Sequence, residues 1–305
     1  MVTTETFSGQ LNEPNEIGLL TPWELDFRQI GVGSGQTPVT IRSGPVLSAL
    51  SLHMDCRVHQ VGTSPEAMVT FGVPLSQSLC GWMGARVPED FVLCFGSGHE
   101  FDGVTEKGFR AVTLSLRQTD FEMLAEDFGL DVPDHAFVPE ILDLTARKRL
   151  FRMMSSQAAR YADAREPEAD LGTDEELVLS MLLATSSARV LGSAGNENER
   201  NKVLRRAMEI IEAESEDPIT VRDLCKRCQT SWSTLHRAFT DRFGIGPKRY
   251  LMALRLCRVR ADLLNAAPGM RVADAANRWG FWHMGQFARD YQKVFTRRPS
   301  EDLRS

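Results

Sequence analysis

The sequence lacks any run of about 18 apolar residues, the length that a transmembrane helix requires. Its first ten residues also lack the basic segment and apolar core of a secretory signal. The 42% hydrophobic and 25% charged residues are typical of a folded protein, and the length of 305 residues suits about two domains. We therefore expect a cytoplasmic protein that does not enter a membrane.

Cysteine is scarce as well. Six cysteines scattered over the chain are too few for a disulfide scaffold. Cys225 and Cys228 form a CxxC pair, but no second pair and no suitably spaced histidines accompany it, so a tetrahedral zinc site would lack ligands. On a helix both cysteines would lie on the face of Leu224, which favours a place in the core.

Catalytic motifs are also missing. The chain contains no GxSxG nucleophile elbow, no phosphate-binding Walker A loop and no HExxH zinc motif. It also lacks a His-x-His pair that could bind a metal in a cupin barrel, because His53 and His59 are six residues apart. We expect neither enzymatic activity nor a metal site, and no cofactor.

The charges that are present divide the chain in two. Residues 1–199 contain 14 Lys and Arg against 29 Asp and Glu, a net charge of −15, whereas residues 200–305 contain 21 against 12, a net charge of +9. Together they give the overall charge of −6. A basic segment of this size indicates a partner that carries phosphate groups, and the polar, glycine-containing stretch 191–199 is a suitable linker.

The acidic part changes its periodicity along the chain. Residues 39–116 contain short apolar segments separated by Gly, Pro and Ser, a pattern typical of a small barrel or sandwich. Residues 119–193 contain three segments of helical periodicity. The last of these, 174–191, carries an apolar stripe that suits either the core or a dimer interface. The stripe consists of Leu177, Met181, Ala184, Ala188 and Leu191.

Two helix-turn-helix patterns occupy the basic part. In residues 221–239, Leu224 and Cys228 share an apolar face and Ser231 is a suitable N-cap for the second helix. In residues 272–291, Gly280 supplies the turn. A helix over 248–265 is expected to join the two patterns. In such a unit the second helix enters the major groove of duplex DNA.

Exposed polar residues on the two second helices are the predicted base contacts, with arginine suited to guanine and glutamine to adenine. They are Ser233, His236, Arg237, His283, Gln286 and Arg289. Other cations are predicted to contact phosphates, although a solvated surface residue explains any single one equally well. These are Lys202, Arg249, Arg255, Arg258 and Arg298. Trp282 suits contact with a partner and internal packing equally.

Residues 200–301 resemble the DNA-binding domain of AraC/XylS-family transcription regulators. The matching residues are Leu224, Leu235, Phe239, Phe243, Gly244, Pro247, Tyr250, Arg255, Leu256, Ala275, Ala276, Gly280, Phe281, Phe287, Tyr291, Phe295 and Pro299. The stretch 280–295 is especially similar to the ethanolamine-operon activator branch. The resemblance implies base contacts at Ser233, His236, Arg237, Gln286 and Arg289. Gln229, where Gly is common, and Val259, where Ala is usual, depart from the pattern.

In this family an N-terminal domain of this size usually senses a small molecule and mediates dimerisation, often in a cupin-like barrel. A strand over 46–58 would place His53, Arg57 and His59 on one face, as a solvated surface or as a polar wall for an anionic effector. Trp23, with Arg28 close by, is predicted to cover such a pocket or simply to hold the N-terminus. We take all five residues as candidate effector contacts.

The sequence therefore predicts an α+β chain of two domains. Residues 1–194 form a cupin-like β-barrel with helices that senses a metabolite or nucleotide and dimerises, and residues 195–305 form an all-α DNA-binding domain with two tandem helix-turn-helix units. The predicted function is a ligand-responsive transcription regulator, an activator that engages RNA polymerase as a homodimer. The alternative is a cupin-like sensor whose helical domain docks a protein partner instead of DNA.

Overall fold

A computed structural model describes residues 5–44, 47–76, 79–84, 87, 91–127, 129, 138–139, 144–162, 188–189, 199–213 and 219–303. The chain divides into two compact units. The first comprises Met1–Phe27, Gly35–Asp55 and Gln60–Ala194, and the second comprises Arg28–Ser34, Cys56–His59 and Gly195–Ser305. The predicted linker at 191–198 lies outside the described residues, and the roles assigned to the two predicted domains stay predictions.

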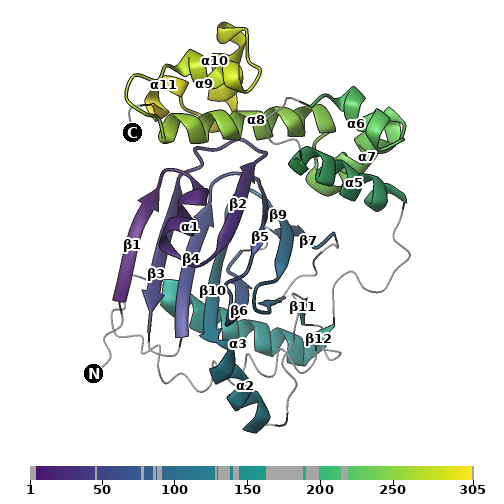
Figure 1. The fold of residues 1–305 in the computed structure, drawn as a ribbon. Coiled ribbons are helices and arrows are strands. Elements are labelled where there is room, and N and C mark those ends of the chain that lie inside the picture. The colour runs from purple at the N-terminus through teal and green to yellow at the C-terminus, as the bar shows by residue number, and fades with distance from the viewer. Residues whose placement is uncertain are drawn as a thin grey trace. The chain divides into compact units, whose positions relative to one another are not determined.

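Two antiparallel β-sheets dominate the first unit (Figure 1). The larger has the order β1-β3-β4-β10-β6-β8 and the smaller the order β2-β5-β9-β7. Their strands are β1 (Glu5–Leu11), β2 (Glu24–Gln29), β3 (Thr37–Ser43), β4 (Leu47–Met54), β5 (Val58–Thr63), β6 (Met68–Pro74), β7 (Leu79–Trp82), β8 (Leu93–Phe95), β9 (Glu100–Thr105) and β10 (Phe109–Arg117). The two sheets remain separate, so the prediction of a closed cupin-like barrel is wrong, whereas the prediction of a sheet-rich N-terminal part is confirmed.

Alternation of side chains gives the larger sheet two different faces. Ala49, Phe71 and Leu114 belong to a buried cluster with residues of helices α2 (Gln118–Asp127) and α3 (Leu144–Ala162). Figure 1 shows α3 crossing the strands of this sheet. Their sequence neighbours Leu50 and Thr113 point to the opposite face, where a cavity lies between the sheets. The first unit is therefore layered as helices, large sheet, cavity and small sheet.

The short elements of the first unit connect these layers. Between β1 and β2 the chain forms the 3-10 helix η1 (Pro14–Glu16) and the single turn α1 (Ile17–Leu20). The two-residue strands β11 (Val138–Pro139) and β12 (Ala188–Arg189) pair with each other. The strand at Ala188 shows that the helix predicted over 174–191 does not reach its expected end, and residues 174–187 lie outside the described residues.

One predicted strand has the wrong bounds, and two strands were not predicted. The strand expected over 46–58 is interrupted, because β4 ends at Met54 and β5 begins at Val58. Strands β1 and β2 precede residue 39, where no strand was expected. Strands β6 and β10, in contrast, lie in the region around 39–116 that the short apolar segments predicted to be rich in strands. Because residues 55–57 turn the chain between β4 and β5, His53 and His59 do not lie on the same strand.

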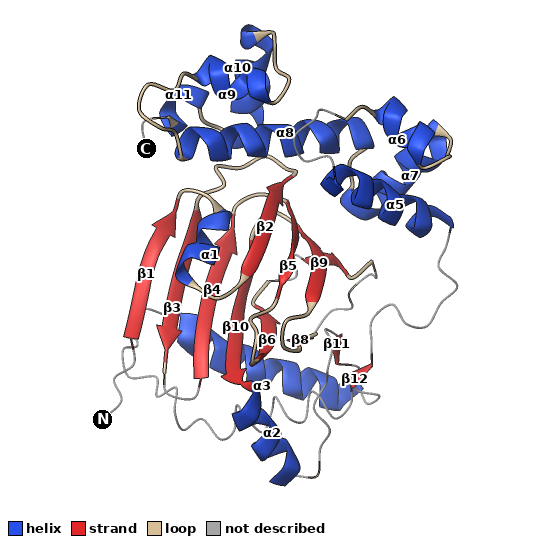
Figure 2. Cartoon of the chain, in the orientation of Figure 1, coloured by secondary structure: helices blue, strands red, loops and turns tan. Residues whose placement is uncertain are grey.

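Helices make up the described C-terminal part of the second unit (Figure 2). They are α5 (Glu199–Ala213), α6 (Val221–Arg227), α7 (Trp232–Phe243), α8 (Pro247–Leu264), α9 (Val272–Arg278), α10 (Met284–Phe295) and α11 (Pro299–Asp302). Helix α8 agrees with the joining helix expected over 248–265, and Pro247 at its first position suits a helix start. Within the described parts of the chain, no helix is both long and apolar enough to cross a bilayer.

Candidate DNA-binding surface

Helices α6 and α7 form the first helix pair, and local capping defines its turn. The Thr220 hydroxyl accepts a hydrogen bond from Asp223 N (3.2 Å), and the Asp223 carboxylate accepts one from Thr220 N (3.1 Å). The Thr220 hydroxyl also donates to the Asp223 carboxylate (2.5 Å), and this bond, together with the one from Thr220 N, lowers the pKa of Asp223. After α6, Gln229 has a φ of 51° and its N–H donates to Lys226 O (3.2 Å), while Thr230 N donates to Cys225 O (3.0 Å). This arrangement is a Schellman motif with a left-handed glutamine.

Helices α9 and α10 form a second pair with the same turn chemistry. Gly280 has a φ of 79°, its N–H donates to Asn277 O (3.0 Å), and Phe281 N donates to Ala276 O (3.0 Å). The predicted turn residue is therefore confirmed as the left-handed residue of a Schellman motif. The predicted N-cap Ser231 is confirmed in the first pair, where its hydroxyl accepts from Thr234 N (3.1 Å).

Aromatic packing fixes the second helix of each pair. Phe239 and Phe243 of α7 are buried and lie within 4.6–5.4 Å of the Tyr250 ring in α8, measured between ring centroids. Tyr291 and Phe295 of α10 are buried at the equivalent positions, with 4.6 Å between their ring centroids. Because α8 contributes buried residues to both clusters, it holds both helix pairs in one unit.

A buried ionic cluster anchors α10 to the C-terminal turn. The Tyr291 hydroxyl donates to Asp302 Oδ2 (2.6 Å), and the Arg260 and Arg297 guanidinium groups each lie 3.4 Å from this carboxylate. Asp302 and Tyr291 are fully buried. Burial raises the pKa of Tyr291, and the hydrogen bond to Asp302 raises it further. The cluster keeps α8, α10 and α11 in a defined arrangement.

The predicted base contacts lie mostly on exposed helix surface. Arg237 on α7 and Arg289 on α10 are exposed and occupy equivalent positions, each two residues after the buried Leu235 or Phe287. Arg289 donates to Gln286 Oε1 (2.9 Å), and Gln286 donates to Asp290 Oδ1 (2.9 Å). Ser233 and His283 are also exposed, whereas His236 is half-buried.

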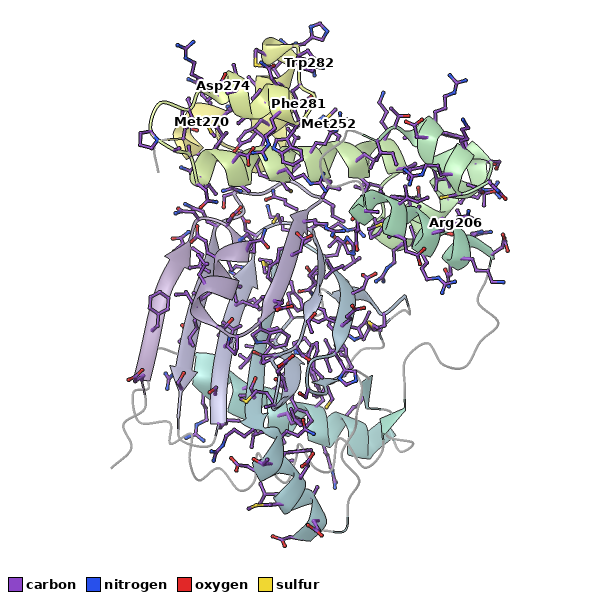
Figure 3. The ribbon with its side chains drawn as sticks, viewed as in Figure 1. Arg206, Met252, Met270, Asp274, Phe281 and Trp282 are labelled. Carbon is purple, nitrogen blue, oxygen red and sulfur yellow. The ribbon has the colours of Figure 1, made fainter. Side chains whose placement is uncertain are left out.

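Two tryptophans stand out on this surface. Trp232 is 61% exposed and Trp282 is 73% exposed, although each begins or precedes the second helix of its pair. Figure 3 labels Trp282 beside Phe281, which in contrast is buried. The structure therefore decides against internal packing for Trp282. The Trp232 ring packs against the His236 ring, with 4.8 Å between ring centroids.

The predicted phosphate contacts fall into two groups. Lys202, Arg249 and Arg298 are exposed. Arg255 and Arg258 are half-buried, and their guanidinium carbons lie 5.4 Å from the Phe281 ring and 5.0 Å from the Trp279 ring. Burial lowers the pKa of Arg255. The last two arginines therefore contribute to packing, and the phosphate contacts of all five stay predictions.

A groove beside α7 contains two cations that the sequence did not single out. It has a volume of about 500 Å³ and is lined by residues from three helices. Arg222 comes from α6, Trp232 and His236 from α7, and Lys248 and Arg249 from the start of α8. Arg222 and Lys248 are 26 residues apart, so only the fold reveals that they share a surface with a predicted reader helix.

The two cysteines of the CxxC pair differ in burial. Cys228 is buried, Cys225 is half-buried, and both are free thiols whose pKa is raised by burial. Across the described stretches of chain, no group of three or more His, Cys, Asp or Glu is arranged to hold a metal ion.

The five candidate effector residues are divided between the two units, and Arg28 and His59 share a hydrogen-bond partner. His53 lies on β4 next to Leu52, which lines the cavity, so alternation points it to the other face. His59 is fully buried and its Nδ1 lies 2.7 Å from the Tyr250 hydroxyl in the second unit. A single polar wall is therefore wrong, because the chain turns between these histidines.

Arg28 lies close to His59, because its Nη1 donates to the same Tyr250 hydroxyl (3.4 Å). Arg28 is buried and its Nη1 lies 3.2 Å from Glu212 Oε1 within the second unit. Arg57 belongs to the same unit, where its carbonyl oxygen accepts a hydrogen bond from Ile30 N (2.9 Å). Trp23 alone of the five lines the cavity of the first unit. Whether any of them binds an effector stays a prediction.

That cavity has a volume of about 60 Å³ and lies between the two sheets. Leu50, Leu52 and Thr113 line it from the large sheet. Aromatic rings make up most of the rest of the cavity lining, and the Trp82 ring stacks on the Phe101 ring with 5.3 Å between centroids. The cavity escaped sequence analysis because its residues come from strands that pair across long sequence separations.

The helical part matches known families. A family model described as a helix-turn-helix domain matches residues 224–305. The chain is 38% identical over 104 residues to the probable thc operon regulatory protein of Rhodococcus erythropolis, covering 34% of this chain and 31% of that protein. It is 30% identical over 129 residues to XylDLEGF operon transcriptional activator 2 of Pseudomonas putida, covering 42% of this chain and 81% of that protein.

Similarity extends to a solved structure. The chain is 33% identical to a probable AraC family transcriptional regulator from Rhodopseudomonas palustris, covering 33% of this chain and 94% of that one, with a TM-score of 0.31. The chain spans only about a third of the length of the first curated relatives, 31% and 37%.

Proposed function

Since the chain belongs to the AraC/XylS family of DNA-binding transcriptional regulators, we propose that helices α6–α7 and α9–α10 are two tandem helix-turn-helix units that read two successive major grooves. One observation carries this proposal. Both pairs have the same Schellman turn, followed by a helix with an exposed arginine two residues after its first buried anchor. Arg237 and Arg289 would then each contact a guanine.

The groove beside α7 supports a second element of the proposal. Arg222, Lys248 and Arg249 give its walls a positive charge, and duplex DNA carries phosphates along both edges of the major groove. Together with Lys202 and Arg298 they would hold the backbone while α7 reads bases. Charge at these positions sets affinity, whereas the reader arginines set sequence preference.

The first unit is proposed to sense a small-molecule effector and to mediate homodimerisation. The cavity between its sheets supports the first role, because ligand sites in proteins are concave and largely apolar. As a cytoplasmic regulator, the protein would use effector binding to control its engagement of a promoter and of RNA polymerase as an activator. The similarity of residues 280–295 to the ethanolamine-operon activator branch stays part of this proposal.

The test is selection of duplexes from a random library by the full chain, followed by affinity measurements on the selected and on random sequences. Arg289→Ala should weaken the selected duplex by about 1–3 kcal/mol more than random DNA. Lys293→Ala, one turn further along the exposed face of α10, is the matched control and should weaken both equally. Failure to enrich any sequence contradicts the proposal.

The exposed tryptophans favour a second candidate function, in which the helical part docks a protein partner. Trp232 and Trp282 would be its anchors, since large aromatic residues dominate binding energy at protein interfaces. Under this alternative, Trp282→Ala would abolish partner capture, and an excess of duplex DNA would not compete with it.

A further inference from the structure

Two residues that line the cavity of the first unit have a buried polar atom with no hydrogen-bond partner among the described residues. Trp82 is 2% exposed, and its indole Nε1 is buried without a hydrogen-bond partner. The hydroxyl oxygen of Thr113, on the central strand β10, is also buried and unpartnered. Both residues line the cavity, but its accessible wall is almost wholly apolar, so a ligand reaches these two polar atoms when their side chains shift slightly toward it. A buried donor without an acceptor costs free energy comparable to a lost hydrogen bond, so such groups are rare in folded proteins.

The surrounding surface is apolar and uncharged. Among the described residues that line the cavity, none is ionisable, and Gln60 contributes the remaining polar side chain. Trp23, Phe95 and Phe101 provide aromatic walls, with ring centroids 5.3–5.8 Å apart. An ionised ligand would lose its hydration here without gaining a counter-charge, which is strongly unfavourable.

From these observations we propose that the cavity binds a small, uncharged, mostly apolar molecule with one hydrogen-bond acceptor, such as a ketone or aldehyde. The Trp82 indole N–H donates to that acceptor, and the Thr113 hydroxyl provides a second donor. This inference rests on the proposed effector-sensing function and names its ligand class. It replaces the anionic effector that the sequence suggested.

The size of the cavity limits the ligand. A site needs about 10–15 Å³ of this volume to hold one water, so 60 Å³ corresponds to roughly four to six water positions. A molecule of about that many non-hydrogen atoms fits without rearrangement of the sheets. Cyclopentanone matches this size and carries one carbonyl acceptor, which makes it a suitable probe.

The experiment compares three probes on the full chain labelled with ¹⁵N. Cyclopentanone has the acceptor, cyclopentane lacks it, and cyclobutanecarboxylate adds a negative charge. The readout is the indole N–H signal of Trp82 in the proton–nitrogen spectrum, assigned by its loss in Trp82→Phe. Cyclopentanone should shift this signal in a saturable manner, whereas the carboxylate at the same concentration should leave it unchanged.

Two variants test the hydrogen bonds. Thr113→Val keeps the side-chain shape and should weaken cyclopentanone binding by roughly 5–10-fold without changing cyclopentane binding, because one hydrogen bond is lost. Trp82→Phe should do the same, and because it lacks the Trp82 signal its binding is followed through the indole N–H signal of Trp23, which lines the same cavity. Trp23→Phe is the matched control, since Trp23 lines the same cavity but its indole nitrogen is not among the buried unpartnered atoms. Trp23→Phe should keep the preference for ketone over alkane.

Several results would overturn the inference. They are binding of the carboxylate as tightly as the ketone, an unchanged preference in both Thr113→Val and Trp82→Phe, or no shift of the Trp82 signal by any probe. DNA affinity, measured separately, distinguishes this from the proposed function. If cyclopentanone binds as expected but never changes DNA affinity, the ligand class stands and the regulatory role fails.

Discussion

Replacing Gln229 by glycine should stabilise the second unit. Gln229 occupies the left-handed position of the Schellman motif after α6, with a φ of 51°. A residue with a Cβ atom is strained in this conformation, by about 1–2 kcal/mol. Glycine removes the strain but increases the entropy of the unfolded chain, which costs about 0.5–1 kcal/mol. The net gain is therefore about 0.5–1 kcal/mol.

The repeat in the fold provides an internal control. Gly280 occupies the same position after α9, with a φ of 79° and the same pair of backbone hydrogen bonds. Gly280→Ala should destabilise the second unit by about the amount that Gln229→Gly stabilises it. For a unit of about 100 residues these changes move the unfolding midpoint by roughly 2–6 °C in opposite directions.

Differential scanning calorimetry of the full chain measures both effects on the transition of the second unit. Circular dichroism should show unchanged helix content in both variants. If Gln229→Gly lowers the midpoint, or if the two substitutions move it in the same direction, the two turns are not equivalent and the argument from the repeated turn fails.

Three further outcomes are expected. The free energy of unfolding should fall above about pH 10 by roughly 1.4 kcal/mol per pH unit because of Tyr291. In this range the phenol ionises in the unfolded chain, whereas in the folded chain its raised pKa keeps it protonated. Urea unfolding of Tyr291→Phe should not show this loss of stability. Asp302→Ala should destabilise the second unit by roughly 3–5 kcal/mol in calorimetry, because it leaves buried arginine charge uncompensated. Arg222→Gln combined with Lys248→Gln should reduce the salt dependence of DNA binding, the slope of log K against log salt, by about 2.

Each of these has a clear contrary result. An equal loss of stability at high pH in wild type and Tyr291→Phe would show that other groups cause it. A loss below about 1 kcal/mol for Asp302→Ala would mean that the arginines are solvated. For the groove, an unchanged slope in the Arg222→Gln, Lys248→Gln variant would contradict the phosphate contacts. Lys107→Gln in the first unit makes the same kind of charge change and is the control that should leave the slope unaltered.

The helical part was predictable because its signals are local. Ser231 caps α7 through its own side chain, Pro247 begins α8, and Gly280 ends a helix pair, so each acts within a few residues of its position. Leu235 and Phe239, which are among the residues that carry the family resemblance, lie four positions apart on one helix face and are both buried. Such local signals can be read from the sequence because they do not depend on tertiary contacts.

The strands were less predictable, because the alternation of buried and exposed residues can continue where the backbone turns and a strand ends. Cys56 and Val58 are buried, so the alternation of apolar residues continues through the turn that ends β4. The pattern therefore predicted one strand where there are two. His59 was expected on an open face, but its partner Tyr250 is 191 residues away and leaves no signal near it.

The candidate sites also differ in how far the sequence could predict them, because some depend on local signals and others on tertiary packing. Exposed arginines on helices can be identified from periodicity, as Arg237 and Arg289 were. The groove containing Arg222 and Lys248 depends on the packing of three helices. The cavity at Trp82 depends on which strands pair, and no motif in the sequence encodes that.

The central claim is that two helix pairs read two major grooves, and chemical footprinting of the full chain on a selected duplex tests it most directly. The account predicts two clusters of protected guanines about one helical turn, roughly 10 base pairs, apart. Arg237→Ala should remove protection in one cluster and Arg289→Ala in the other. A single protected cluster, or loss of the same cluster in both variants, would contradict the account.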